Sequence, residues 1–217
     1  QGKFASGSAA VKTLVKIFTA TSSAKAKHQK IGKGLVVGDK KPGMLRKMKS
    51  KAFVTLMKPL NAVGDKLVWS KVKDGFGGKV KLIISGGSAL SGSLESFYET
   101  AGIPVVVGYG LTECSPLISF RNSDSNLVTA GCVGKPTMDT EIRVIDPDTK
   151  RDLNERPALP TGEVGVVIAR GPQVMHGYYK NPMATYEAID RFGWFDTGDL
   201  GKVNPATGDI ILTGRKK

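Results

Sequence analysis

Residues 108–113 (GYGLTE) combine side chains that suit a site for a nucleotide and magnesium. The aromatic ring of Tyr109, set between two glycines, can lie flat against a planar base. The Thr112 hydroxyl can donate to a phosphate oxygen, and the Glu113 carboxylate is a hard ligand of the kind that Mg²⁺ prefers. The alternative is that Tyr109 is a core aromatic and Glu113 an acid favoured by the dipole at a helix start. The spacing favours the nucleotide site.

A second segment of small residues, 85–89 (SGGSA), directly follows the apolar run at 81–84. Small residues at the end of a buried strand let a flat or phosphorylated ligand approach the backbone. A plain strand-to-helix turn has the same composition, so this segment alone does not decide between the two interpretations.

A third pair of segments, 193–200 (GWFDTGDL) and 213–217 (TGRKK), supplies charges for a sugar. The Asp199 carboxylate can accept hydrogen bonds from both hydroxyls of a ribose, and Arg215 can donate to the same sugar or to a phosphate. These two residues meet only if a hairpin forms across the turn at 205–208. Otherwise Asp199 is a turn acid and Arg215 a solvated charge, and both interpretations stay open.

The elements that must position these groups are strands and one crossover helix. Apolar runs predict buried strands at 81–84 and 103–107, with a helix between them that begins at Ser91 or Gly92 and stops at Gly102. Strand, helix and strand in this order indicate a parallel unit, in which ligands bind at the carboxyl ends of the strands. Further strands are predicted at 141–145 and 165–169, a short helix from Asn181-Pro182 to about residue 189, and a closing hairpin of 200–203 with 209–212.

The first third of the chain is basic and helical. Residues 1–80 hold 18 Lys or Arg against three acids, whereas residues 81–217 hold 14 against 16. Apolar residues at spacings of three and four predict helices over 8–30 and from Leu45 onward, with Pro59 kinking or ending the second. The apolar stripes either pack on the protein's own core or contact a membrane whose anionic headgroups meet the lysines. Nucleic acid is not expected, because no aromatic platform or nucleic-acid motif accompanies the charges.

Cysteine and histidine usage argues against a zinc site. Cys114 and Cys132 form no Cys-x-x-Cys pair, and the two histidines, His28 and His176, are far apart in sequence, so a reducing compartment is the default. Cys114 is expected to be a small buried residue and His176 a surface or packing residue. No apolar run reaches the roughly 18 residues that a membrane-spanning helix needs. The chain opens with Gln1 and shows no signal peptide, so we expect its start to mark a cut.

Taken in order, these motifs resemble the acyl-adenylate-forming family of acyl-CoA synthetases, luciferases and peptide-synthetase adenylation domains. The resemblance covers about residues 79–217, and the run at 170–182, with the long helical stretch before Lys79, is most similar to long-chain acyl-CoA synthetases and plastid-type acyl-acyl-carrier-protein synthetases. The matching segments are 109–113 (YGLTE), 134–136 (GKP), 162–163 (GE), 170–182 (RGPQVMHGYYKNP), 197–199 (TGD) and 214–215 (GR).

The resemblance implies an α/β fold that is the second half of the family's large N-terminal AMP-binding domain, as an internal fragment of it. Within residues 1–217 it implies four parts. These are a basic helical insertion at 1–78, a parallel β/α nucleotide-binding part at 79–128, a β-rich barrel-like subdomain at 129–214, and at 215–217 the start of a hinge to a small C-terminal domain.

Residue by residue, the resemblance also implies the contacts of a nucleotide. Thr112 and Glu113 are the candidate catalytic residues. Gly108, Gly110 and Leu111 complete the cofactor-binding segment. By the same matching Gly87, Ser88 and Ala89 border the adenine, Tyr109 stacks on it, Thr112 touches the α-phosphate, Glu113 binds Mg²⁺, Asp199 and Arg215 bind the ribose, and Lys217 is the hinge.

The implied reaction is the activation of a long-chain fatty acid with ATP and Mg²⁺ to acyl-AMP, followed by transfer to coenzyme A or to an acyl carrier protein. The 217 residues contain no match to the family's phosphate-gripping loop or to its C-terminal catalytic lysine. We therefore expect them to carry the adenine and ribose half of the site and to be inactive alone. The alternative is a non-enzymatic truncated paralogue that binds a membrane or a carrier protein through its basic helices. An intracellular location is expected, with a plastid or a membrane surface as candidates.

Overall fold

The computed structural model describes residues 9–35, 40–121, 131–147 and 152–216. The chain divides into two compact units. The helical unit comprises residues 1–37, 41–83 and 91–105, and the sheet unit comprises residues 38–40, 84–90 and 106–217. Each unit is described by itself below. The domain boundaries expected at 78/79, 128/129 and 214/215 remain predictions.

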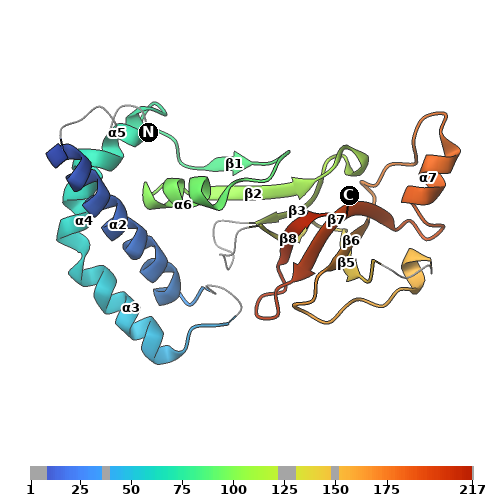
Figure 1. Cartoon of the computed structure of the whole chain (residues 1–217), viewed down its shortest axis with the longest axis horizontal. Coiled ribbons are helices and arrows are strands. Elements are labelled where there is room, and N and C mark those ends of the chain that lie inside the picture. Colours follow the sequence, from blue (N-terminus) through green and yellow to red (C-terminus); the bar gives the residue numbers. More distant parts are fainter. Residues whose placement is uncertain (1–8, 36–39, 122–130, 148–151, 217) are drawn as a thin grey trace. The chain divides into compact units, whose positions relative to one another are not determined.

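The helical unit is built on two long amphipathic segments that pack side by side (Figure 1). The first is the predicted helix at 8–30, which the structure confirms as α2. The second breaks at Met57, and Pro59 lies in the first turn of the next helix, where a missing N–H costs nothing. The helices of this unit are α2 (Ala9–Gly32), α3 (Met44–Leu56), α4 (Lys58–Gly64), the π-helical η1 (Asp65–Trp69), α5 (Ser70–Asp74) and α6 (Gly92–Thr100).

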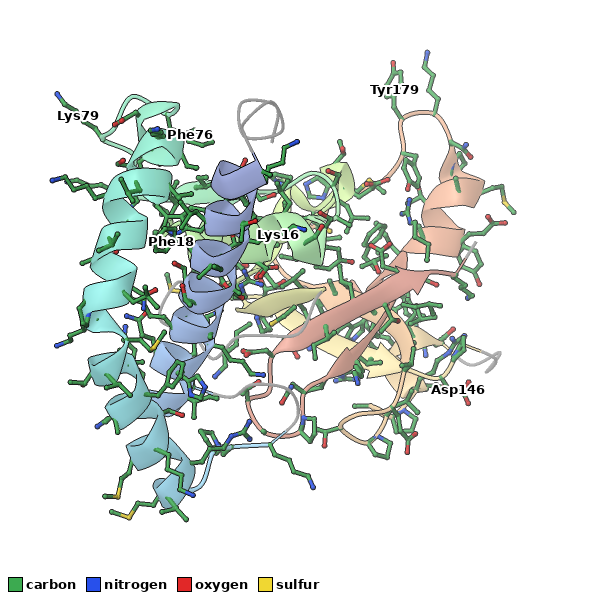
Figure 2. The ribbon with its side chains drawn as sticks, turned by 60° about the vertical axis from the view of Figure 1, so that its left-hand side comes forward. Lys16, Phe18, Phe76, Lys79, Asp146 and Tyr179 are labelled. Carbon is green, nitrogen blue, oxygen red and sulfur yellow. The ribbon has the colours of Figure 1, made fainter. Side chains whose placement is uncertain are left out.

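Phe18 and Trp69 form the centre of the helical core. Phe18 points from α2 toward α4 (Figure 2), and Gly64 allows this close approach because a Cβ there would lie 2.9 Å from the Phe18 ring. Trp69, which is 1% exposed, donates from Nε1 to Ser22 Oγ at 2.9 Å, and Ser22 donates in turn to Asn61 Oδ1 at 3.3 Å. The buried polar groups are therefore paired, as a core requires.

Helix α6 begins and ends where its sequence predicts. Ser91 is the N-cap, since its Oγ accepts from Leu94 N at 3.3 Å, and the chain leaves the helix through Gly102 at φ +75°. Phe97 packs edge-on against Trp69 with 5.9 Å between ring centroids. Phe97 and Tyr98 are the residues of this helix that pack on the core, whereas Leu94 is 42% exposed.

The sheet has eight strands in the order β1-β2-β3-β4-β8-β7-β6-β5. β1 and β2 run in the same direction (Figure 1), as expected for a strand, helix and strand unit. The prediction of a buried strand at 81–84 was wrong in its bounds and burial, because β1 spans Ile83–Ser85 and Ile84 is 76% exposed. Every pairing from β2 to β5 is antiparallel. The strands are β1 (Ile83–Ser85), β2 (Val105–Gly110), β3 (Leu117–Arg121), β4 (Cys132–Pro136), β5 (Glu141–Ile145), β6 (Gly165–Arg170), β7 (Phe195–Val203) and β8 (Ile210–Arg215), and the short helices of this unit are η2 (Thr112–Cys114), η3 (Leu153–Glu155) and α7 (Pro182–Ala188).

The antiparallel part of the sheet packs on Trp194, which is fully buried. Two guanidinium groups lie over its ring, with Cζ of Arg143 4.3 Å and Cζ of Arg170 4.7 Å from the ring centroid. Its Nε1 donates to Asn154 Oδ1 at 3.1 Å. The residues that pack around it are Ile145, Leu153, Val166, Ile168 and Leu200.

The predicted closing hairpin is confirmed and is longer than expected. β7 and β8 pair from Val203 opposite Ile210 out to Asp199 opposite Arg215. Asn204 fixes the turn, because its Oδ1 accepts from the backbone N–H of Ala206 at 2.9 Å. Among the described residues no helix has the length and apolar character needed to cross a bilayer.

Candidate functional site

Tyr109 lies near the carboxyl end of β2 with its ring buried and its hydroxyl paired. β2 continues through Gly110 and does not stop at residue 107, so alternate side chains, those of Val105, Val107 and Tyr109, point inward. Tyr109 is 7% exposed, and its hydroxyl donates to Asp199 Oδ2 at 2.8 Å. Burial, followed by the contact with Asp199, raises the pKa of the phenol, so the hydroxyl stays a donor throughout the physiological range.

Asp199 is held by two donors from two other strands. Arg215, directly opposite on β8, donates from Nε to Asp199 Oδ1 at 2.9 Å, while Tyr109 donates to Oδ2. The backbone N–H of Asp199 donates to Thr197 Oγ1 at 3.1 Å, and that hydroxyl donates to Val167 O at 2.7 Å. Asp199 is 9% exposed, whereas the Arg215 side chain is 65% exposed. The pair therefore orients the carboxylate more than it stabilises the fold.

Gly110 allows the chain to fold back after β2. A Cβ at this position would lie 1.7 Å from the Pro116 carbonyl oxygen, and the next residue, Leu111, donates its N–H to that same oxygen at 2.8 Å. The returning loop contains η2 and places Thr112 at the surface with Glu113 half-buried beside it. The motif at 108–113 thus needs glycine for a steric reason as well as for any ligand.

Glu113 is tethered through both its side chain and its backbone. Its Oε1 accepts from the Tyr178 hydroxyl at 3.0 Å, and its carbonyl oxygen accepts from Met175 N at 2.7 Å. Burial raises the pKa of Tyr178, and the hydrogen bond to Glu113 and the charge of Glu113 raise it further. This phenol therefore also remains a donor.

The donor set at Glu113 suits a cation that takes its other ligands from phosphate and water. Within the described ranges no group of three or more His, Cys, Asp or Glu gathers to form an all-protein cage. Mg²⁺ is usually bound by one or two carboxylates together with substrate phosphates and water. A single oriented carboxylate beside an exposed Thr112 hydroxyl fits that requirement.

The small-residue loop after β1 lies beside β2. A Cβ at Gly86 would lie 3.6 Å from the Gly108 carbonyl oxygen, which places the start of the loop against this strand. Gly87, Ser88 and Ala89 are exposed, and Gly87 has φ +81° with open space where a side chain would stand. The loop therefore leaves backbone accessible at the end of β1.

The structure joins some predicted site residues directly and leaves others as neighbours. Asp199 contacts both Tyr109 and Arg215, so the hairpin that the sequence required is present. Gly108 and Leu111 are half-buried on either side of Tyr109 and Gly110. Lys217, expected as a hinge, lies outside the described residues.

Two supporting residues were not identified from the sequence. Tyr178 binds Glu113 from 65 residues away, and Thr197 supports Asp199 through its hydroxyl. Both belong to segments recognised only as family motifs, and no spacing in the sequence pairs Tyr178 with Glu113. A contact between distant segments leaves no local signal of this kind.

Cys114 is buried, as expected, and its pKa is raised to about 11 by burial and then by the Glu113 charge. Only the thiolate reacts, and the pKa of the thiol is raised from its ordinary value of 9.0 to about 11. We therefore expect iodoacetamide at pH 8 to alkylate Cys114 about a hundredfold more slowly in the folded chain than in the unfolded chain. The rate should rise with pH up to about 11. A Cys132→Ser variant isolates this thiol, and the same variant in urea is the control; equal rates in both conditions would contradict the assignment.

Comparisons with known proteins agree with this architecture. The family model described as "AMP-binding enzyme" matches residues 10–179. The chloroplastic "Probable acyl-activating enzyme 16" of Arabidopsis thaliana is 42% identical over 168 residues, which are 73% of this chain and 22% of that protein. A chloroplastic long-chain-fatty-acid–[acyl-carrier-protein] ligase of the same plant is 37% identical over 177 residues, or 77% of this chain and 23% of that protein.

The fold comparison points to the same group of enzymes. The structure of ATP-bound MatB from Rhodopseudomonas palustris matches with a TM-score of 0.55 and 31% identity, covering 63% of this chain and 25% of that one. The chain spans less than a quarter of the length of the two plant relatives. The expected α/β fold and the family resemblance are both confirmed. The chain belongs to the AMP-binding enzyme family.

Proposed function

We propose that the protein containing this chain activates a long-chain fatty carboxylate with ATP, forming acyl-AMP and pyrophosphate, and passes the acyl group to a thiol. The plant ligase with 37% identity supports the fatty acid as substrate and an acyl carrier protein as one acceptor, with coenzyme A as the alternative. The structural observation that carries the proposal is the Asp199 carboxylate, fixed by Tyr109 on β2 and by Arg215 on β8.

In this proposal the sheet unit provides the nucleoside half of the site. Asp199 accepts the ribose hydroxyls and Arg215, whose side chain is largely exposed, donates to the ribose. Gly87, Ser88 and Ala89 offer exposed backbone to the adenine. The ring of Tyr109 is 7% exposed, so little of it is free to contact a base in this conformation. Stacking stays a prediction, and its hydroxyl contact with Asp199 is a positioning role.

The phosphates would lie toward Thr112 and Glu113. The exposed Thr112 hydroxyl donates to an α-phosphate oxygen, and Glu113 holds Mg²⁺. The metal, when bound, neutralises charge that develops on the phosphate oxygens. The chain's own contribution is to orient one donor and one carboxylate in fixed backbone after Gly110.

The test is fatty-acid-dependent pyrophosphate release by the protein expressed from its whole reading frame, with ATP, Mg²⁺ and palmitate. Release that requires palmitate supports adenylation. Adding either coenzyme A or an acyl carrier protein bearing its phosphopantetheine arm then identifies the acceptor by which thioester forms. No release with any long-chain fatty acid would contradict the proposal.

A plastid location is proposed on narrower grounds. The two plant relatives described above are both chloroplastic. A fluorescent fusion of the whole protein in plant cells checks this, and a signal confined to the cytosol or peroxisomes would contradict it.

We also propose peripheral contact with an anionic membrane, because α3 presents an apolar stripe that its own unit does not cover. Its inner face packs on α2 through Ser50 and Phe53, which contact His28. The opposite face carries Met44 at 80% and Met48 at 60% exposure, and sulfur-tipped side chains project from this helix in Figure 2. The other strongly exposed apolar residues on α3 are Leu45 and Leu56.

Charge favours a lipid surface as the partner of this stripe. Neither α3 nor α4 contains an acidic residue, and Lys47, Lys49 and Lys51 flank the apolar positions. Each lysine near an anionic bilayer contributes about 1 kcal/mol, while the apolar side chains enter the interface. The stripe and the charges thus act together on one surface.

The double variant Met44→Gln with Met48→Gln replaces both methionines by glutamine. It is expected to bind vesicles of phosphatidylcholine with phosphatidylglycerol about tenfold more weakly, because partial burial of two methionine side chains is worth roughly 1–3 kcal/mol. The matched control is Met138→Gln with Met183→Gln, which changes two methionines that are 87% and 68% exposed in the sheet unit. Sedimentation with vesicles measures both. Equal binding by the two double variants, or no binding by the wild type, would contradict the proposal and leave the stripe to a protein contact.

A further inference from the structure

The loop between β6 and α7 reaches Glu113 at two points, and its function is not explained by the nucleotide contacts above. Tyr178 donates from its hydroxyl to Glu113 Oε1 at 3.0 Å, and Met175 donates its backbone N–H to the Glu113 carbonyl oxygen at 2.7 Å. Both contacts lie within the sheet unit. One residue of the candidate site is therefore fixed by a segment more than 60 positions later in sequence.

Tyr178 is itself held firmly by the first turn of α7. Its backbone N–H donates to Thr185 Oγ1 at 2.9 Å, and that hydroxyl donates to Asn181 O at 3.0 Å. Asn181 caps the helix, because its Oδ1 accepts from Ala184 N at 3.1 Å. Gly177 packs so closely that a Cβ there would lie 2.7 Å from Thr185 Cγ2. The phenol is thus presented to Glu113 from backbone that is hydrogen-bonded to α7 and packed against Thr185.

The hydrogen bond restricts the one torsion of Glu113 that matters for a metal. The terminal torsion of a glutamate is broad and roughly two-fold, so an unpaired carboxylate turns easily. A donor on Oε1 selects one orientation and leaves Oε2 available, and no described residue donates a hydrogen bond to Oε2. Mg²⁺ demands near-ideal octahedral geometry and responds strongly to how its carboxylate is aimed.

We propose that Tyr178 is a positioning residue that aims the Glu113 carboxylate at a divalent cation carried by the nucleotide phosphates. The inference rests on the proposed adenylation, since that reaction brings the cation to Glu113. Tyr178 acts through Glu113 and touches neither substrate nor metal. Loss of such a supporting hydrogen bond typically weakens metal binding by about 10- to 100-fold.

The test compares two neighbouring tyrosines in the protein expressed from its whole reading frame. Tyr178→Phe removes the hydroxyl and keeps the ring, and Tyr179→Phe removes an adjacent hydroxyl whose side chain is 88% exposed and projects from the loop (Figure 2). We expect Tyr178→Phe to raise the Mg²⁺ concentration for half-maximal pyrophosphate release by about tenfold, with the rate restored at saturating Mg²⁺. Tyr179→Phe should behave as the wild type.

Direct metal binding gives a second readout. Electron paramagnetic resonance counts free Mn²⁺, an oxygen-preferring substitute for Mg²⁺, in the presence of ATP and protein. Tyr178→Phe should bind Mn²⁺ about tenfold more weakly than Tyr179→Phe in this assay. Equal Mn²⁺ affinity of the two variants would overturn the inference.

A second background separates positioning from folding. In Glu113→Gln the carboxylate is gone, so adding Tyr178→Phe should change Mn²⁺ affinity no further. An equal additional loss in that background would show that Tyr178 acts through the fold and would overturn the inference. If the wild type fails to release pyrophosphate, the proposed function is contradicted. If the wild type is active and Tyr178→Phe leaves its Mg²⁺ dependence unchanged, only the positioning role is contradicted.

Discussion

Asp199→Ala is expected to lower palmitate-dependent pyrophosphate release by at least about a hundredfold. The substitution removes the carboxylate proposed to accept the ribose hydroxyls, and charge-assisted hydrogen bonds are worth about 1.5–3 kcal/mol each, so two of them account for a factor of this size. It also leaves the buried Tyr109 hydroxyl, which donates to Asp199 at 2.8 Å, without its acceptor. Initial rates at saturating palmitate and at ATP concentrations well below KM measure the effect as a loss in kcat/KM for ATP.

An exposed acid of the same unit is the matched control. Asp152 pairs with Arg191 at 3.7 Å on the surface, with half of its side chain exposed, and Asp152→Ala should leave the rate within about twofold because such pairs contribute little. Circular dichroism verifies that both variants are folded. If Asp199→Ala retains more than a third of the wild-type rate, Asp199 does not hold the ribose.

Gly110→Ala is expected to destabilise the sheet unit by about 3 kcal/mol, because overpacking against backbone has no flexible side chain to absorb it. The added Cβ would lie 1.7 Å from the Pro116 carbonyl oxygen, so the chain reversal after β2 must open. In the 217-residue chain the two tryptophans report on different units, Trp69 on the helical unit and Trp194 on the sheet unit. With Trp69→Phe as background, urea unfolding followed by Trp194 fluorescence should shift its midpoint down by about 1–2 M.

Gly214→Ala is the control for this experiment. Gly214 lies on β8 of the same unit, and a Cβ there would meet nothing within 4 Å. The urea midpoint of this variant should stay within about 0.3 M of that of the parent, since surface substitutions rarely change the free energy of unfolding by more than about 0.5 kcal/mol. An equal shift in the two alanine variants would show that the close approach at Gly110 is relieved without cost.

Local signals predicted the elements that carry their own caps or periodicity. Ser91 and Asn181 begin helices because their side chains satisfy free backbone N–H groups, and the structure places both as caps. The hairpin of β7 and β8 followed from two apolar runs around a turn, and it was the condition for bringing Asp199 and Arg215 together.

The strands β3 and β4 were not predicted, and buried polar residues explain why β3 was missed. Ser119 and Arg121 occupy inward positions of β3 at 0% and 1% exposure, where an apolar pattern would have revealed the strand. Ser119 donates to Val133 O and Arg121 to Cys132 O, both on β4. Their burial depends on partners that only the folded sheet supplies.

Tyr109 shows that the type of a residue and its neighbours in sequence do not determine whether its ring faces a ligand or the core. The sequence left a nucleotide-facing ring and a core aromatic as alternatives, with the spacing favouring the first. In the structure the ring is buried and its hydroxyl donates to Asp199, the other candidate nucleotide ligand. The residue joins the core to the candidate site, and no property of a single segment distinguishes that arrangement from either alternative.

The contact of Tyr109 with Asp199 also sets an order of events during synthesis. It links residues 90 positions apart, and β4, early in the sheet, pairs with β8, the last strand. At a translation rate of about 5–20 residues per second, a nascent chain waits roughly 5–20 s between the emergence of Tyr109 and that of its acceptor. Until β8 follows, β4 presents an unpaired edge to other chains. The contacts of Asp199 with Tyr109 and Arg215 therefore form among the last in the sheet, and nascent chains are most open to chaperones and to misassociation in that interval.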